Sequence, residues 1–376
     1  MRATASVVLT LAVGVGVVGA GVAYVALNPP TKSALTTSLP EAQTLVAHPG
    51  PITVTWVTPQ QGATGVPSDT AIAVHFATPL ASSVVDPTLS PPVAGSWQQL
   101  GAATLQFTPQ APLVPGSTET VSLPQGQIAG AGRSAQTLAQ PFSAQFTVAP
   151  GSTLRLQQLL AQLGYLPVTW TPSSTTPASP AAAASPQPGN FAWRWPSTPP
   201  ALEALWQPGA DNVMVQGAVM AFENDNGLTT DGIPGPQVWT ALLADAAAGK
   251  GSSFGYSFVL TSKALPETLN LWHDGQIAVT SPANTGIPAS PTPDGTWPVY
   301  LRYRTTTMSG VNPDGTPYHD TGVPWVSYFH GGDAVHGFLR ASYGSQQSLG
   351  CVELPYAVAG QVWPLMEIGT LVSVTG

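Results

Sequence analysis

Apolar and polar residues alternate with a period of two in two separate parts of the chain. Residues 51–150 hold short runs such as 72–76, in which every second side chain is apolar, and Gly, Pro and Asp turns separate the runs. Several short strands at this spacing predict a β-sandwich. Residues 254–376 alternate in the same way, for example at 256–260. They predict a mostly antiparallel β domain with one short helix after Pro355.

Residues 151–248 follow a period of 3.6 instead. Four leucines fall at i, i+3, i+4 and i+7 between residues 156 and 163, and Gly164 follows where a helix C-cap belongs. Two further helices are expected around 215–222 and after residue 236, which gives a small three-helix module. The stretch 171–200 is rich in Ser, Thr, Pro and Ala, and we expect it to be a disordered insertion. The whole chain is therefore expected to be multidomain and mainly β.

The first 28 residues predict an export segment. An apolar run from Val7 to Leu27 reaches the roughly 20 residues that a membrane-spanning helix needs, and Arg2 before it favours an N-terminus inside. No clear small-x-small cleavage site follows, so a retained anchor is favoured over a removed signal peptide. Residues 29–50 resemble a polar linker. In either case the remainder is expected outside the cytoplasm, anchored to the membrane or secreted.

The charge content narrows the classes of partner. Only 7% of the residues are Asp, Glu, Lys or Arg, and the net charge is -8 with ten basic residues. No positive stripe for a phosphate backbone is present, which argues against a nucleic-acid partner. The sequence also contains no HExxH, CxxC or phosphate-cradling glycine loop, so we expect neither a metal nor a nucleotide cofactor.

The candidate chemistry lies near the C-terminus, around the single cysteine. An exported chain normally pairs its cysteines, but Cys351 has no partner within the chain. This favours a functional thiol over the alternatives of a buried thiol or an intermolecular bridge. Acyl transfer by a thiol needs a base and donors for the developing oxyanion. His336 is the candidate base, and an adjacent imidazole is expected to lower the thiol pKa by ion pairing. Gly350 removes bulk before the cysteine, so backbone N–H groups can face an incoming carbonyl oxygen.

These residues carry a family resemblance. The runs "PTPDGTWPVY", "HG", "SLGCVEL" and "GTLVSV" resemble the L,D-transpeptidase catalytic domain, the YkuD-like family, over about 120 residues. The resemblance implies that Cys351 is the nucleophile, His336 the base, and Gly337 the residue whose carbonyl orients the imidazole. Ser348 and Gly350 match the positions that flank the cysteine in the family motif.

Two positions depart from that motif. Leu349 stands where the family has a second histidine, and Glu353 stands where it has Arg or Asn. Upstream, the aromatic stretch 325–329 is mostly expected in the core, with Trp325 and Tyr328 as candidates for the substrate groove. The histidines at 273, 319 and 330 compete for the role of base, but only His336 has the following glycine and the preceding apolar strand.

Two other segments resemble modules of surface proteins. "PQQGATGVPSDTAIAVHFATPL" is similar to bacterial Ig-like domains, for which a spacer role is favoured over ligand binding. "LQQLLAQLGYL" and "AVMAFENDNGLTTDGIPGPQVWTALL" resemble the halves of a helical peptidoglycan-binding module. Together the resemblances imply an L,D-transpeptidase that acts on peptidoglycan stem peptides, with glycan as a further partner. An L,D-carboxypeptidase and a non-catalytic wall-binding scaffold are the alternatives.

Overall fold

The computed structural model describes residues 47–174, 177 and 179–376. The expected export segment and most of the expected linker lie outside these residues. Within the described part of the chain, no helix combines the length and the apolar character that a membrane span needs.

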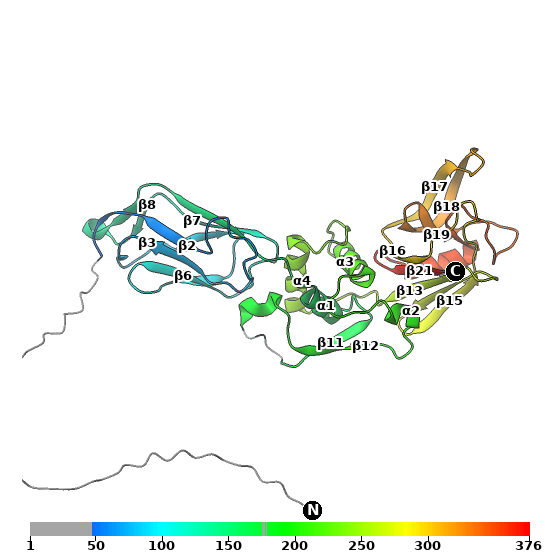
Figure 1. The fold of residues 1–376 in the computed structure, drawn as a ribbon, viewed down its shortest axis with the longest axis horizontal. Helices are drawn as coiled ribbons and strands as arrows, with labels where there is room; N and C mark the ends of the chain where they lie inside the picture. Colours follow the sequence, from blue (N-terminus) through cyan, green and yellow to red (C-terminus); the bar gives the residue numbers. More distant parts are fainter. Residues whose placement is uncertain (1–46, 175–176, 178) are drawn as a thin grey trace, which may run out of the picture. The chain divides into compact units, whose positions relative to one another are not determined.

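The N-terminal β region consists of three small sheets around one apolar core (Figure 1). One sheet has the order β2-β3-β6-β5, the second β10-β7-β4 and the third β1-β9-β8. Alternation places Ile72, Val74 and Phe76 inward on one strand, with at most 5% of each side chain exposed. The strands are β1 (Gly50–Ile52), β2 (Val54–Thr58), β3 (Ile72–Phe76), β4 (Thr88–Ser90), β5 (Gly95–Gln99), β6 (Thr104–Pro109), β7 (Thr118–Leu123), β8 (Gly126–Ala129), β9 (Gln136–Leu138) and β10 (Phe142–Thr147).

The region that follows contains four helices and a β-hairpin. Its elements are α1 (Thr153–Gln162), β11 (Val168–Pro172), β12 (Gly189–Trp193), α2 (Pro200–Glu203), α3 (Val213–Asp225) and α4 (Pro236–Ala248). Asn212 caps α3 by accepting bonds from the backbone N–H groups of residues 214 and 215. Pro236 begins α4, and Gly249 ends it with a φ of 65°. The simple three-helix module expected from the sequence is not confirmed, because the hairpin and the short α2 are interposed.

The stretch 171–200 corrects one expectation. Its described residues are not disordered: β11 pairs with β12 in antiparallel register, and a 3-10 helix (Pro180–Ala184) lies between the two strands. The physical reason lies in the aromatic residues around the polar run. Phe191 packs edge-on against Trp206 with ring centroids 5.1 Å apart, and Trp193 contacts the same indole.

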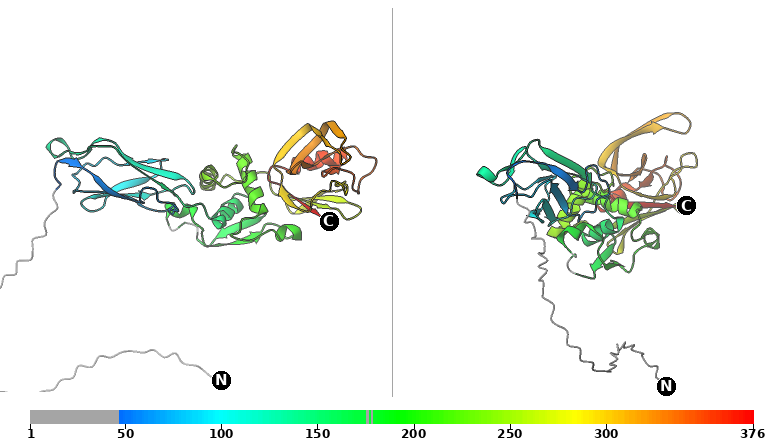
Figure 2. Two further views of the ribbon diagram at one scale, coloured as in Figure 1. Left: turned by 45° about the horizontal axis from the view of Figure 1, so that its top comes forward. Right: turned by 60° about the vertical axis from the view of Figure 1, so that its left-hand side comes forward.

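The C-terminal β region has two sheets with α5 (Tyr356–Val362) between them (Figure 2). The first sheet has the order β15-β14-β13-β21-β16 and the second β17-β18-β19-β20. The hairpin of β17 and β18 is long and projects from the rest of the region (Figure 1). The strands are β13 (Ser257–Ser262), β14 (Thr268–His273), β15 (Gln276–Pro282), β16 (Gly295–Pro298), β17 (Leu301–Val311), β18 (Pro317–His330), β19 (Asp333–Gly337), β20 (Val352–Leu354) and β21 (Leu371–Thr375).

One apolar core is shared by the helical region and the first of these sheets. Leu159 of α1, Phe222 of α3 and Trp239 of α4 belong to the same buried cluster as Phe258 of β13 and Leu371 of β21, and each is at most 1% exposed. Apolar burial of this kind is the main favourable term in folding. The helical region is therefore packed into the C-terminal β region rather than joined to it by a free linker.

Candidate active site

Two neighbouring strands bring Cys351 and His336 together. β19 and β20 are parallel, with Val335 opposite Val352 and His336 opposite Glu353. Cys351 directly precedes β20 and so lies beside Ala334. Because alternate residues of a strand share a face and neighbouring strands lie about 5 Å apart, Cys351 and His336 are on one face of the sheet.

Both side chains line a cavity of about 540 Å³, which we call the Cys351 cavity. One wall comes from the loop before Cys351 and from strands β19 and β20. The opposite wall comes from the β17–β18 hairpin, including Met308, Tyr318 and Asp320. A cavity of this size suits a short peptide, and polar or charged side chains make up about half of its lining.

The burial and the hydrogen bonding of His336 suit a role as a base. Only 2% of its surface is exposed, and its Nδ1 lies 3.1 Å from the carbonyl oxygen of Gly337. Since a carbonyl only accepts, Nδ1 carries the proton in this contact, and Nε2 of the neutral ring keeps its lone pair. Burial lowers the pKa of His336 below its usual value, although the bond to Gly337 and the charge of Glu353 oppose that shift. The imidazole is therefore neutral near pH 7.

The surroundings of Cys351 raise the pKa of its thiol, whereas the sequence led us to expect a lowered pKa. The residue is half-buried, and desolvation of the sulfur raises its pKa to about 12. A hydrogen bond from the backbone of Ala334 lowers the pKa, but the carboxylates of Asp333 and Glu353 raise it further. The sulfur lies 3.9 Å from the carbonyl oxygen of Gly332. The resting pair is accordingly a neutral thiol and a neutral imidazole.

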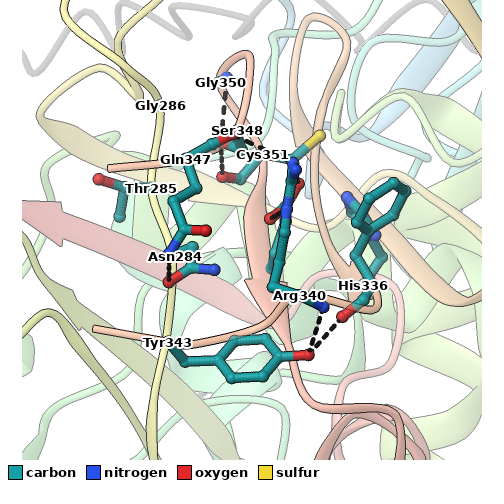
Figure 3. Close-up of polar contacts among 12 residues, drawn as sticks. Asn284, Thr285, Gly286, His336, Arg340, Tyr343, Gln347, Ser348, Gly350 and Cys351 are labelled. Carbon is teal, nitrogen blue, oxygen red and sulfur yellow. Dashed lines mark hydrogen bonds and ion pairs between the residues drawn. The ribbon is translucent and has the colours of Figure 1, made fainter. Parts of the chain in front are cut away.

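A tight loop holds the cysteine in place (Figure 3). Ser348 is 1% exposed; its hydroxyl donates to the carbonyl oxygen of Cys351 at 2.6 Å and accepts from the N–H of Gly350 at 3.3 Å. Gly350 has a φ of 119°, and a Cβ at this position would overlap Oδ1 of Asp333. The N–H of Gly350 therefore closes the turn instead of facing the cavity, which corrects its expected role. In the view of Figure 3 the sulfur points toward the side on which His336 lies.

Two residues of the segment before β16 donate hydrogen bonds to this loop. Thr292 is fully buried; its hydroxyl donates to the carbonyl oxygen of Gly350 at 2.7 Å and accepts from the N–H of Gly286 at 2.8 Å. Ser290 donates to the carbonyl oxygen of Leu349 at 3.0 Å. Reasoning from the sequence missed this anchor, although Thr292 lies within the quoted run "PTPDGTWPVY", so the signal was present without an assigned role.

Three parts of the chain match models of known families. Residues 257–374 match the family model of the L,D-transpeptidase catalytic domain. Residues 49–148 match the bacterial Ig-like domain, and residues 209–242 match a putative peptidoglycan-binding domain. The last match covers all of α3 and the first half of α4, but not α1.

Solved structures of similar proteins are L,D-transpeptidases. An enzyme from Mycobacterium smegmatis is 15% identical over 87% of this chain and 100% of its own, with a TM-score of 0.29. L,D-transpeptidase 3 from Mycobacterium tuberculosis, in complex with a faropenem-derived adduct, is 15% identical over 86% of this chain and 98% of its own, also at 0.29. The catalytic domain of the E. faecium enzyme is 26% identical over 32% of this chain and 96% of its own, again at 0.29. A search of curated proteins gave no match.

The transpeptidase-like domain accommodates its unusual Glu353 with a cation from the neighbouring loop. Arg340 donates from Nε and Nη2 to the two carboxylate oxygens of Glu353 at 2.8 and 2.7 Å, which is a bidentate ion pair. The guanidinium also lies 4.7 Å from the ring centroid of Phe338, which in turn packs edge-on against His336. All four side chains line the Cys351 cavity. The acid that replaces the Arg or Asn of the family motif is therefore neutralised at the site.

A second polar network orders the loop between β19 and β20. Asn284 is fully buried, and its side-chain oxygen accepts from the N–H of Gly344 at 3.0 Å and from Nε2 of Gln347 at 3.2 Å. Its backbone exchanges two hydrogen bonds with Glu353, at 3.0 and 2.9 Å. Figure 3 shows Asn284 and Gln347 on the side of the loop away from His336. Asn284 therefore fixes both this loop and strand β20.

The two aromatic candidates for substrate binding differ in position. Trp325 packs beside α5, with its ring centroid 5.6 Å from that of Trp363, and it is not among the described side chains that line the Cys351 cavity. Its expected place in the groove is thus corrected. Tyr328 is also outside the described lining, and burial is the main cause that raises the pKa of its hydroxyl.

The competing histidines are engaged elsewhere. His330 pairs with Asp333 at 3.2 Å, His273 lies 2.8 Å from the hydroxyl of Ser257, and His319 lies 2.8 Å from that of Ser309. None of these three histidines is among the described residues that line the Cys351 cavity. Among the described residues, no group of three or more His, Cys, Asp or Glu side chains is arranged to hold a metal ion.

Proposed function

We propose that this protein is a cysteine-dependent L,D-transpeptidase that cross-links peptidoglycan stem peptides. The observation that carries the proposal is the pairing of strands β19 and β20, which puts Cys351 and His336 in the same cavity, with Nδ1 of His336 bonded to Gly337. The family match over residues 257–374 supports the same reaction class. The matches to Ig-like and peptidoglycan-binding domains support a place of action at the cell wall, outside the cytoplasm.

The proposed reaction uses the neutral pair described above. Nε2 of His336 accepts the thiol proton as the sulfur of Cys351 bonds to the carbonyl carbon on the L-side of the diaminopimelate to D-alanine bond. The tetrahedral intermediate collapses, and His336 returns the proton to the departing amine of D-alanine. A thioester remains on the enzyme. The side-chain amine of a second stem then attacks it, gives its proton to His336, and releases the thiol and a cross-link between third-position residues.

The environment of the sulfur supports transfer of the proton during attack rather than before it. A thiol that resists ionisation is a poor nucleophile at rest, but it avoids oxidation in an exported protein. Since the N–H of Gly350 is engaged by Ser348, the N–H of Cys351 is the donor that we assign to the developing oxyanion. The carboxylates of Asp333 and Glu353 oppose negative charge here, and the Arg340 ion pair reduces that effect for Glu353.

Intact-protein mass spectrometry with a carbapenem tests the nucleophile. The thiol attacks the carbonyl carbon of the strained lactam ring, so one adduct is expected on the wild type and none on Cys351→Ala. His336→Gln is expected to slow adduct formation by about a hundredfold or more. His319→Gln is the matched control, because this exposed ring lies on a strand next to residues of the cavity wall yet faces away from them. Equal rates for the two histidine variants would refute the role of His336.

Product analysis on purified disaccharide-tetrapeptides tests the reaction. Cross-linked dimers with loss of one D-alanine are expected from the wild type, and both products should vanish with Cys351→Ala. Trimmed monomers without dimers would identify a carboxypeptidase instead. Binding to sacculi without an adduct or product would identify a wall-binding scaffold. Membrane anchoring through the first 28 residues belongs to the same proposal and is tested by fractionation of cells that express the full chain.

A further inference from the structure

The hairpin of β17 and β18, which projects from the C-terminal β region (Figure 1), places a carboxylate in the Cys351 cavity. Tyr318 and Asp320 both line this cavity, and His319 between them faces the other way, where its ring lies 2.8 Å from a serine hydroxyl. A strand imposes this alternation on its side chains. The carboxylate of Asp320 therefore lies on the wall opposite strands β19 and β20.

The cross-strand partners of these residues agree with that direction. Asp320 is opposite Met308, which lines the same cavity, and Tyr318 is opposite Gly310. A Cβ on Gly310 would lie 2.7 Å from the ring of Tyr318, so the ring lies across the glycine. The hairpin thus presents Met308, Tyr318 and Asp320 on one face.

The carboxylate of Asp320 has no partner among the residues that the structure describes. No side chain or backbone N–H donates a hydrogen bond to it, and no Lys, Arg or His forms an ion pair with it. The other charged side chains of the cavity are engaged. Arg340 and Glu353 pair with each other, and Asp314 accepts from the backbone N–H and the hydroxyl of Thr316. Of the carboxylates in the described lining, Asp320 is the one whose oxygens lack a donor.

The position of Asp320 makes its charge effective inside the cavity. The residue is half-buried, and charges interact more strongly where water is partly excluded. The charge also acts on the base: burial lowers the pKa of His336, and the charge of Asp320 is one of the effects that oppose this shift. A carboxylate placed in this way attracts a cation and repels an anion.

The remaining walls select the kind of cation. A single carboxylate without other free ligands suits a metal ion poorly, because metal ions take several ligands from a protein. The cavity also has apolar surface, and part of it comes from Leu349, which stands where the family motif has a second histidine. The other apolar side chains are Ile287, Met308 and Phe338. An ammonium at the end of an aliphatic chain can place its methylene groups on these walls and its charge on Asp320.

We infer that Asp320 is a specificity-determining residue that binds the ammonium of the acceptor stem before it attacks the thioester. The inference rests on the proposed function, in which the acceptor is a side-chain amine. The bound ammonium loses one proton to water and becomes the free amine, and the second proton passes to His336 during the attack. By holding the amine beside the thioester, Asp320 favours transfer over hydrolysis. The same charge repels the carboxylate of the departing D-alanine and so favours its release.

Two matched competitors test the inference on the unmodified protein. Cross-linked dimers formed from disaccharide-tetrapeptides are counted by mass spectrometry. The first competitor, acetyl-homoarginine carboxamide, carries a guanidinium that binds carboxylates but does not attack a thioester. The second, acetyl-homocitrulline carboxamide, has the same shape without the charge. The cation should inhibit dimer formation at a concentration at least about tenfold lower than the neutral compound. Equal inhibition would overturn the inference.

Variants of the carboxylate give a second test. An isotope-labelled tripeptide stem serves as the acceptor, because it has no D-alanine to release and cannot act as a donor. Asp320→Asn should raise the KM for this acceptor at least about tenfold, and Asp320→Glu should restore most of the loss. Asp86→Asn is the matched control: it removes one negative charge at an exposed position of the Ig-like domain and should leave this KM unchanged.

The outcomes separate this inference from the proposed function. If the wild type forms dimers and Asp320→Asn forms them with the same acceptor KM, the inference fails and the proposed function stands. If the wild type gives trimmed monomers alone, or no product, both fail. If circular dichroism shows that Asp320→Asn does not fold, the two competitors decide the question on the wild type.

Discussion

The neutral state of the Cys351 thiol leads to a prediction about its alkylation. Cys351 is the single cysteine of the chain, so iodoacetamide reports on it without interference. Only the thiolate reacts. The pKa of Cys351 is raised from an ordinary 9.0 to about 12, because the sulfur is desolvated and faces Asp333 and Glu353. Three pH units separate these values, so at pH 7.5 the thiolate fraction is about a thousandfold below that of a free cysteine.

The shape of the pH profile is the decisive quantity, because it does not depend on access to the cavity. The logarithm of the alkylation rate of the folded protein should rise by about one for each pH unit from pH 7 to pH 10, without a break. The same protein unfolded in urea should level off near pH 9. Intact-mass spectrometry of samples quenched over time gives both profiles. A plateau of the folded protein's rate above pH 6 or 7 would show a thiolate–imidazolium pair and refute the reasoning.

The same shift has a consequence for stability. The folded state holds the thiol proton more tightly than the unfolded state does, since its pKa is the higher one. The contribution of Cys351 to the free energy of unfolding is therefore fully present below pH 9 and is lost as the pH rises toward 12. Cys351→Ala should remove this alkaline dependence.

Three further predictions concern stability and the support of the site. Burial raises the pKa of Glu223 to about 7, so the stabilising contribution of this carboxyl is complete below about pH 4.5 and is lost as the pH rises through 7. Glu223→Gln should therefore stabilise the protein by up to about 3 kcal/mol at pH 8. The same variant should leave the melting temperature at pH 4.5 unchanged. Arg340→Met should destabilise the protein by about 3 kcal/mol in urea titrations, because Glu353 loses its partner, and the double change to Met at both positions should restore most of that loss. Thr292→Val should cost about 1–3 kcal/mol and slow carbapenem acylation at least tenfold, because the carbonyl oxygen of Gly350 loses its donor; an unchanged acylation rate would contradict the anchoring role.

The placement of Cys351 and His336 in one cavity could be expected from the sequence because its signal is local. His336 and Cys351 each stand beside a glycine in a short motif, and their strands show clear alternation. The partners of Glu353 and Gly350 could not be predicted in the same way. Arg340 and Thr292 lie 13 and 58 residues away from the groups that they bond, and only the fold decides which polar side chains meet there.

Two expectations drawn from the sequence differ from the structure. The stretch 171–200 has the polar, Pro-rich character of a disordered segment, but its flanking aromatic residues Phe191 and Trp193 pack against Trp206 and order the hairpin. The expectation of an ion-paired thiol failed for a different reason. Sequence neighbours of a cysteine do not reveal which charges face the sulfur, and here two carboxylates do, Asp333 from the adjacent strand and Glu353 from the cysteine's own.

The parallel pairing of β19 and β20 also bears on how the domain tolerates change. Because a parallel pair needs a crossover, the chain must leave after Gly337 and return at Cys351. The register of the strands fixes the side chains of His336 and Cys351 whatever lies between them. The exposed stretch around Leu339, Ala341 and Ser342 is the natural place for added residues. Extra loop length inserted there, from either evolution or engineering, would reshape the rim of the cleft and so the choice of substrate, while the distance between thiol and imidazole stays as it is.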